Sequence, residues 1–204
     1  MIISHKHKLI FIKTKKTAGT AVQLALAKEC GPDDVLTEIE DTFTPPEALN
    51  GYEPRNNEGW ASHHRWWHFK WQLGEQLCQQ YFKFTLVRNP WERIVSLYWW
   101  EVKNGREKGE FLDWFIEKSG RSGLWNWDMF DPEWVDHVGK YETVEEDYRL
   151  VCEKLGIPIH PLPKGVKEYQ DPERKHYREY YDNWARKIVE ENSQFEIQNF
   201  GYEF

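Results

Sequence analysis

Apolar residues near the start of the chain alternate with polar ones and then give way to a loop. Leu9 and Phe11 belong to such an alternating run, which leads into lysines, threonines and one glycine at positions 13–20. Good helix formers fill 21–27. The pattern predicts a strand, a tight loop and a helix.

A second strand-to-helix turn is predicted further along the chain. Residues 83–87 form a short apolar run rich in strand formers, and Arg88 stands at its end. Asn89 is typical of an N-cap and Pro90 of a first helical residue. The apolar spacing then predicts a helix up to about 104.

The C-terminal half continues the alternation of strands and helices. Residues 136–141 are a candidate strand, and Thr143 with Glu146 forms a capping box for the next helix. Asp171 and Pro172 are expected to cap a last long helix. The chain is therefore predicted to be one α/β domain over 1–204, with a central, mainly parallel sheet flanked by helices.

Two segments fit this alternation less well. Residues 31–62 contain many proline, glycine and asparagine residues and are predicted to be a loop, and 105–134 are rich in glycine, tryptophan and aspartate apart from one helix. Long irregular segments often close over substrates. Both are predicted as lid or substrate segments.

Charge is distributed unevenly along the chain. The net charge is −7, yet residues 1–28 contain six lysines and no acid. This local positive charge favours a small anion over nucleic acid, which needs a broad basic surface. The alternative is a solvated lysine cluster.

Composition limits the cellular setting. The three cysteines are widely spaced, and no apolar run reaches the length of a membrane span or a signal peptide. We expect a cytoplasmic protein without a membrane span.

The first loop has the chemistry of an anion cradle. Lys16 offers a charged donor, Thr17 and Thr20 offer hydroxyls, and the backbone of Ala18, Gly19, Thr20 and Ala21 offers N–H groups at a helix N-terminus. The lysine precedes the glycine, so the loop is not a Walker A box, and a nucleotide triphosphatase is disfavoured.

Arg88 and Ser96 form a second candidate site. Arginine suits a bidentate grip on a terminal phosphate, and a serine about two turns into the helix adds a neutral donor. In the alternative interpretation, Arg88 pairs with Glu92 and Ser96 only packs.

Together, the two sites resemble a known family. Lys-Thr-Ala-Gly-Thr at 16–20 and Val-Arg-Asn-Pro-Trp-Glu-Arg-Ile-Val-Ser-Leu-Tyr at 87–98 are similar to the 5′-phosphosulfate and 3′-phosphate motifs of the sulfotransferase superfamily. The segment 138–147 and the chain's ending resemble its carbohydrate-type branch. The resemblance implies a P-loop-kinase-like fold.

The resemblance also implies the donor and its contacts. The donor would be 3′-phosphoadenosine 5′-phosphosulfate, used without a metal. Lys16 would hold the bridging and leaving oxygens, residues 17–21 would line the phosphosulfate, and Arg88 with Ser96 would take the 3′-phosphate. The family's loop before the last helix implies further contacts from Gly165 and Lys167.

A histidine base is implied by the same resemblance. His63 and His64 precede a short helix expected around 75–81, where relatives carry a histidine, and a free imidazole accepts a proton near neutrality. Both stay candidates. The alternatives are ordinary loop histidines or a metal site that adds His68.

Tryptophans indicate the acceptor. Several of the twelve lie outside the periodic helices, and indoles bind the flat faces of sugars as well as packing cores. We therefore expect a sulfotransferase that acts on a hydroxyl, more readily of a carbohydrate than of a protein tyrosine. The alternatives are a small-molecule kinase with the same loop and a non-catalytic sugar-binding module. The tryptophans that we expect near the acceptor are Trp60, Trp66, Trp67, Trp71, Trp125 and Trp127.

Overall fold

The chain forms two compact units. The computed structural model describes residues 1–39, 44, 46–49, 51–164 and 174–204. Unit 1 comprises Met1–Val87 with Met129–Glu168, and unit 2 comprises Arg88–Asp128 with Tyr169–Phe204. The single-domain organisation and the lid roles of 31–62 and 105–134 stay predictions.

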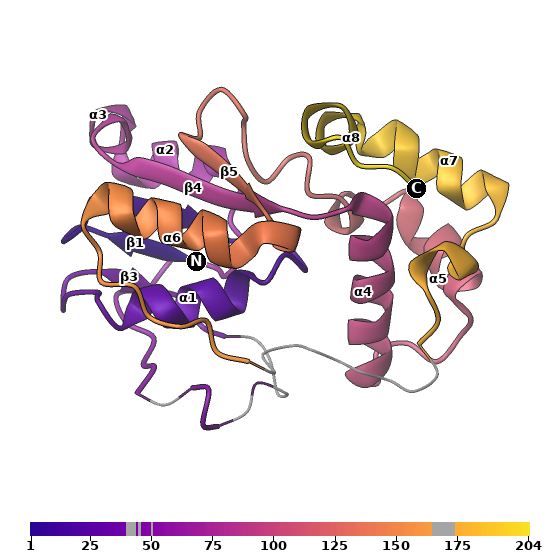
Figure 1. The fold of residues 1–204 in the computed structure, drawn as a ribbon, viewed down its shortest axis with the longest axis horizontal. Helices are drawn as coiled ribbons and strands as arrows, with labels where there is room; N and C mark the ends of the chain where they lie inside the picture. Colours follow the sequence, from indigo (N-terminus) through magenta and orange to yellow (C-terminus); the bar gives the residue numbers. More distant parts are fainter. Residues whose placement is uncertain (40–43, 45, 50, 165–173) are drawn as a thin grey trace. The chain divides into compact units, whose positions relative to one another are not determined.

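A five-stranded sheet in the order β3-β1-β2-β4-β5 forms the centre of unit 1 (Figure 1). β2 pairs in parallel with β4 and β4 with β5, whereas β1 is antiparallel to both β2 and β3. Four of the five strands thus share one direction, which confirms the predicted α/β class with a mainly parallel sheet. The strands are β1 (Ile2–Ser4), β2 (Leu9–Ile12), β3 (Val35–Leu36), β4 (Phe82–Val87) and β5 (His137–Lys140).

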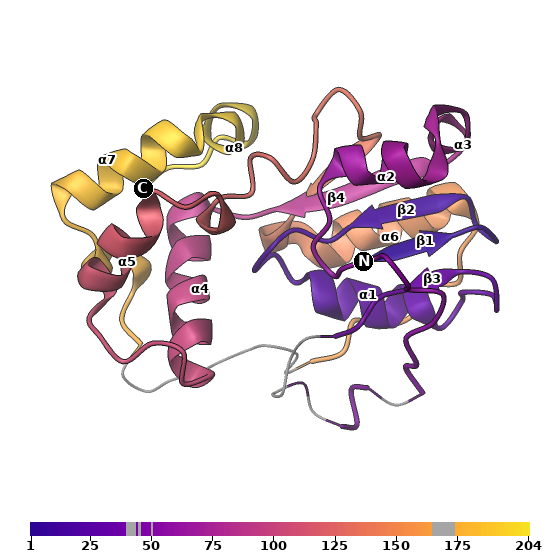
Figure 2. The same ribbon diagram turned by 180° about the vertical axis from the view of Figure 1, so that it is seen from behind.

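Helices cover both faces of this sheet. α1 (Gly19–Ala27) and α6 (Val144–Leu155) lie in front of it in Figure 1, and α2 (Trp66–Leu73) lies in front of it in the reversed view of Figure 2. Phe84 and Leu86 of β4 are fully buried in the core with α1 and α6. α3 (Glu75–Gln79) follows α2.

Unit 2 is helical and has an aromatic core. Its helices are α4 (Pro90–Lys103), α5 (Phe111–Ser119), α7 (Asn183–Asn192) and α8 (Gln194–Phe200). Large aromatic side chains supply much of the buried apolar surface, which is the main stabilising term for such a unit. Buried residues of this core include Trp91, Tyr98, Phe111, Trp114, Phe115 and Trp125.

Two short strands are absent from the sequence prediction. β1 has three residues and β3 has two, which is too short for an alternating pattern to be recognised. The prediction of a loop over the whole of 31–62 is therefore wrong at Val35–Leu36, which pair with Ile2 and Ile3.

Two helix starts also differ from prediction. Thr143 precedes α6, but its hydroxyl donates to Asp147 instead of capping the backbone, so the capping box is wrong. Asp171 and Pro172 lie outside the described residues. After them a short 3-10 turn at Tyr177–Tyr180 comes first, and α7 begins at Asn183 with Asp182 as its N-cap.

Candidate anion-binding and catalytic site

The loop between β2 and α1 is tied to the neighbouring strand. The hydroxyl of Thr14 donates to the carbonyl oxygen of Leu86 at 2.5 Å, and it lies 2.8 Å from the hydroxyl of Thr17. Both threonines are buried. The loop is thereby fixed at the end of β4, immediately before Arg88 in the sequence.

Two residues of this loop have a backbone conformation that is rare outside glycine. Lys16 and Ala18 both have positive φ, 62° and 63°, which is uncommon for residues other than glycine. Alternation of left- and right-handed residues points successive N–H groups toward one place, and α1 starts directly afterwards with its positive dipole end. Such strain is typical of a functional loop.

An unsatisfied hydroxyl lies at the start of α1. The Thr20 Oγ1 atom is buried and has no hydrogen-bond partner within the part of the chain that the structure describes. A buried donor without a partner costs free energy. A bound anion at the helix N-terminus would supply the acceptor, so the residues of the loop fit a phosphate-like group.

Close packing fixes Gly19 against Lys13. A Cβ atom at position 19 would lie 2.7 Å from Cγ of Lys13, whose side chain is buried and donates through Nζ to Oε1 of Gln23 at 2.8 Å. Lys13 therefore runs beneath the loop and ends on α1. This role of Lys13 was not predicted from the sequence, although a lysine directly after a buried strand is a signal for it.

This packing predicts the effect of one substitution. Gly19→Ala is expected to lower the free energy of unfolding by about 1–3 kcal/mol, because Lys13 has to move. Gly31→Ala is the control, since the nearest atom to its added Cβ is 3.8 Å away. Urea unfolding of both variants measures the difference, and equal stability of the two would contradict the packing.

The structure brings His63 to the same loop. Nδ1 of His63 lies 2.8 Å from the backbone oxygen of Lys13. A carbonyl oxygen only accepts, so Nδ1 carries the hydrogen and the neutral ring has its lone pair on Nε2. A histidine in this tautomer, hydrogen-bonded to the loop between β2 and α1, is suited to accept a proton.

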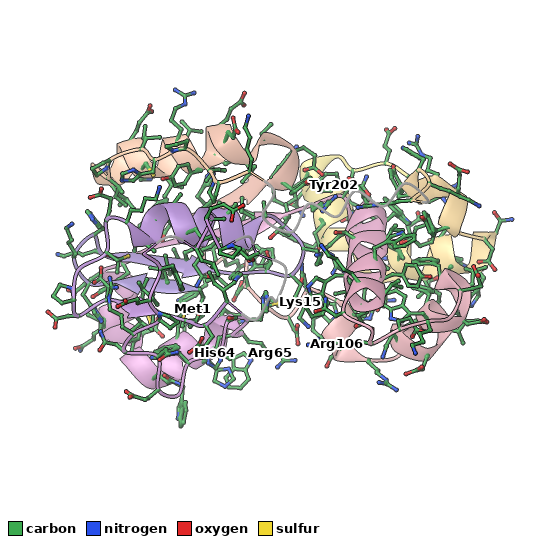
Figure 3. The ribbon with its side chains drawn as sticks, turned by 90° about the horizontal axis from the view of Figure 1, so that it is seen from below. Met1, Lys15, His64, Arg65, Arg106 and Tyr202 are labelled. Carbon is green, nitrogen blue, oxygen red and sulfur yellow. The ribbon has the colours of Figure 1, made fainter. Side chains whose placement is uncertain are left out.

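His64 lies in a different environment. Its Nε2 is 3.2 Å from the oxygen of Gly59, and its ring is 4.5 Å from that of His68. Burial, with a smaller effect of His68, lowers the pKa of His64. The side chains of this region are drawn in Figure 3, where Lys15, His64 and Arg65 are labelled. Of the two candidates, His63 is the one with a hydrogen bond to the loop.

Arg88 and Ser96 belong to unit 2. Both are buried, and Arg88 donates through Nη2 to Oε1 of Glu92 at 2.8 Å. The side chain of Asn89 accepts from the N–H of Glu92 at 3.2 Å, as predicted for the N-cap. The ion pair between Arg88 and Glu92, which the alternative interpretation predicted, is therefore present. The same ion pair holds the guanidinium of Arg88 at the start of α4.

Arg93, within α4, is a second buried arginine that was not predicted from the sequence. Burial lowers the pKa of Arg93 to about 10, while the nearby Glu196 raises it. Burial also raises the pKa of Glu196. The signal was an arginine on the apolar face of the helix, between Trp91 and Ile94, where a charge is expensive unless it is paired.

Three further predictions concern the loop before the last helix, a metal site and a membrane span. Gly165 and Lys167 lie outside the described residues. No group of three histidine, cysteine or acidic side chains is arranged to hold a metal in the described ranges. Within those ranges, every helix is too short or too polar to cross a membrane.

The family of the chain follows from comparison with known proteins. The model of the Sulfotransferase family matches residues 1–121, more than half of the 204 residues. This match includes the loop, His63, Arg88 and Ser96. The chain belongs to the sulfotransferase family.

Several known proteins are similar to this chain. An uncharacterized protein of Archaeoglobus fulgidus is 29% identical over 98 residues, which cover 45% of this chain and 82% of that protein. Carbohydrate sulfotransferase 10 of Xenopus laevis is 21% identical over 87% of this chain and 60% of its own length, and the Homo sapiens protein of that name is 22% identical over 87% and 59%. The chain thus spans about three fifths of these carbohydrate sulfotransferases. A crystal structure of a sulfotransferase from Alicyclobacillus acidocaldarius matches 95% of this chain and 96% of its own, with 15% identity and a TM-score of 0.47.

Proposed function

We propose that this chain transfers a sulfuryl group from 3′-phosphoadenosine 5′-phosphosulfate to a hydroxyl group of a carbohydrate. The observation that carries the proposal is the hydrogen bond between Nδ1 of His63 and the Lys13 oxygen, which joins a base to an anion loop. The family match supports sulfuryl transfer, and the names of the curated relatives support a carbohydrate acceptor.

The proposed reaction is an in-line displacement at sulfur. The acceptor hydroxyl gives its proton to Nε2 of His63 as its oxygen bonds to sulfur. The bond between sulfur and the bridging oxygen of the donor breaks, and the electron pair stays on that oxygen. Adenosine 3′,5′-bisphosphate leaves with this added negative charge.

The loop would stabilise the charge that develops on the leaving oxygen. Lys16 supplies a cation, and the N–H groups of residues 18–20 supply preorganised donors at the start of α1. The N–H of Ala21, also expected to contact the anion, already donates to the backbone oxygen of Ala18 at 3.0 Å. The Thr20 hydroxyl would gain the acceptor that it lacks within the described chain. The family resemblance assigns the 3′-phosphate of the donor to Arg88 and Ser96.

Thermal unfolding with nucleotides tests the donor class. Adenosine 3′,5′-bisphosphate at about 100 times its dissociation constant is expected to add about 2.7 kcal/mol of stability and raise the melting temperature by roughly 5–10 °C. ATP with magnesium is expected to have a smaller effect. A larger shift with ATP and magnesium would favour the kinase alternative, and no shift with either nucleotide would favour the sugar-binding module.

A further inference from the structure

One face of α2 exposes aromatic rings to solvent. Trp67 is 46% exposed and Trp71 is 77% exposed. They are four residues apart and so lie on the same side of the helix, about 6 Å apart along its axis. Exposed tryptophans that share one face commonly mark a binding surface.

His68 joins the two tryptophans into a row. The ring of Trp67 stacks on that of His68 with a centroid distance of 3.9 Å and an interplanar angle of 20°. Trp71 meets the same imidazole edge-on at 6.5 Å and 77°. We call the face formed by Trp67, His68 and Trp71 the α2 aromatic face.

The core of unit 1 does not depend on this face. Phe69 anchors α2 on its buried side, where it is fully enclosed and packs against Trp60 and Trp134 at centroid distances of 5.4 and 6.1 Å. The exposed rings of Trp67 and Trp71 are therefore available for a ligand.

The face also lies close in sequence to the proposed base. Arg65 is the N-cap of α2, only two residues after His63. The ring of His64, the residue next to His63 in the chain, lies 4.5 Å from that of His68. The four residues from His63 to Trp67 span at most about 14 Å of chain, so a molecule of a few sugar units is long enough to contact both.

We propose that the α2 aromatic face binds a sugar unit of the acceptor glycan, next to the unit that carries the reacting hydroxyl. The inference rests on the proposed function and assigns it an acceptor subsite. Flat rings contact the C–H faces of a sugar, while the ring nitrogens of the indoles offer hydrogen bonds to its hydroxyls.

Size and charge favour a sugar over other occupants. Two indoles and one imidazole offer far less area than the roughly 800 Å² per partner of a stable protein interface. Lys70 of the same helix is engaged with Glu75 at 3.1 Å and lies over the ring of Trp66. Contact with rings, more than attraction of charge, is what this face provides.

Binding to immobilised oligosaccharides tests the inference. The probes are a fixed panel of neutral and acidic di- and tetrasaccharides, and the variants are Trp71→Ala and Trp67→Ala with Trp71→Ala. We expect the wild type to be retained by at least one glycan and the double variant to bind it roughly fivefold to tenfold more weakly. Leu150→Ala is the matched control, because Leu150 of α6 is 52% exposed in the same unit.

The outcomes separate this inference from the proposed function. Unchanged retention of the double variant, or no retention of the wild type, would overturn the α2 aromatic face as a sugar site. If the wild type proves to be a dimer and the double variant a monomer, with unchanged glycan retention, the face binds a second copy of the chain, and the sugar site is overturned as well. The melting shift with adenosine 3′,5′-bisphosphate is expected to be equal in all variants, and its absence in the wild type would refute the donor while leaving the glycan result valid.

Discussion

Replacing His63 by alanine is expected to reduce sulfuryl transfer by about 10²–10⁴-fold, the usual effect of losing a general base. The reason is geometric, since the Lys13 oxygen holds Nδ1 and thereby directs the basic Nε2. The measurement is the turnover number with labelled donor. The melting shift caused by adenosine 3′,5′-bisphosphate is expected to persist.

Two variants separate proton transfer from loop structure. His63→Asn keeps an N–H donor for the Lys13 oxygen but cannot act as a base, so it is expected to be as inactive as His63→Ala. His64→Ala is expected to stay within a few-fold of wild type, because His64 bonds to Gly59 and not to the loop. Full activity of both His63 variants would remove this histidine from the mechanism.

Replacing Arg88 by alanine is expected to weaken binding of adenosine 3′,5′-bisphosphate by roughly 10- to 150-fold, because a hydrogen bond to a charged group contributes about 1.5–3 kcal/mol. Adenosine 5′-monophosphate, which lacks the 3′-phosphate, is the matched ligand and should bind equally to both proteins. Lys16→Ala is expected to weaken the binding of both nucleotides. Calorimetry measures the affinities of wild type, Arg88→Ala and Lys16→Ala for both nucleotides.

Glu92 supplies the control for this experiment. Glu92→Gln removes the charge that Arg88 pairs with at 2.8 Å but leaves the guanidinium in place. This variant is expected to bind adenosine 3′,5′-bisphosphate about as well as the wild type does. If Arg88→Ala and wild type bind that nucleotide equally, Arg88 only pairs with Glu92 and the 3′-phosphate assignment is wrong.

Local signals in the sequence were sufficient for the elements that hold the site. The loop after β2 and the N-cap at Asn89 were predictable because each depends on residues within one or two turns of chain. Gly165 and Lys167, by contrast, stay predictions from family resemblance.

Features that depend on distant residues could not be predicted. The choice between His63 and His64 rests on a hydrogen bond to Lys13, 50 residues away in the chain. α2 was missed because its residues WWHFKWQL carry no amphipathic period, and only the burial of Phe69 shows which side faces inward. The buried path of Lys13 beneath Gly19 likewise depends on tertiary packing.

Formation of adenosine 3′,5′-bisphosphate from 3′-phosphoadenosine 5′-phosphosulfate tests the central claim most directly. The nucleotide product and the labelled acceptor are measured together over a panel of oligosaccharides, without added divalent metal. We expect equal amounts of nucleotide product and sulfated glycan with at least one acceptor, and neither product with His63→Ala. No sulfated product from any acceptor, or phosphoryl transfer from ATP instead, would contradict the account.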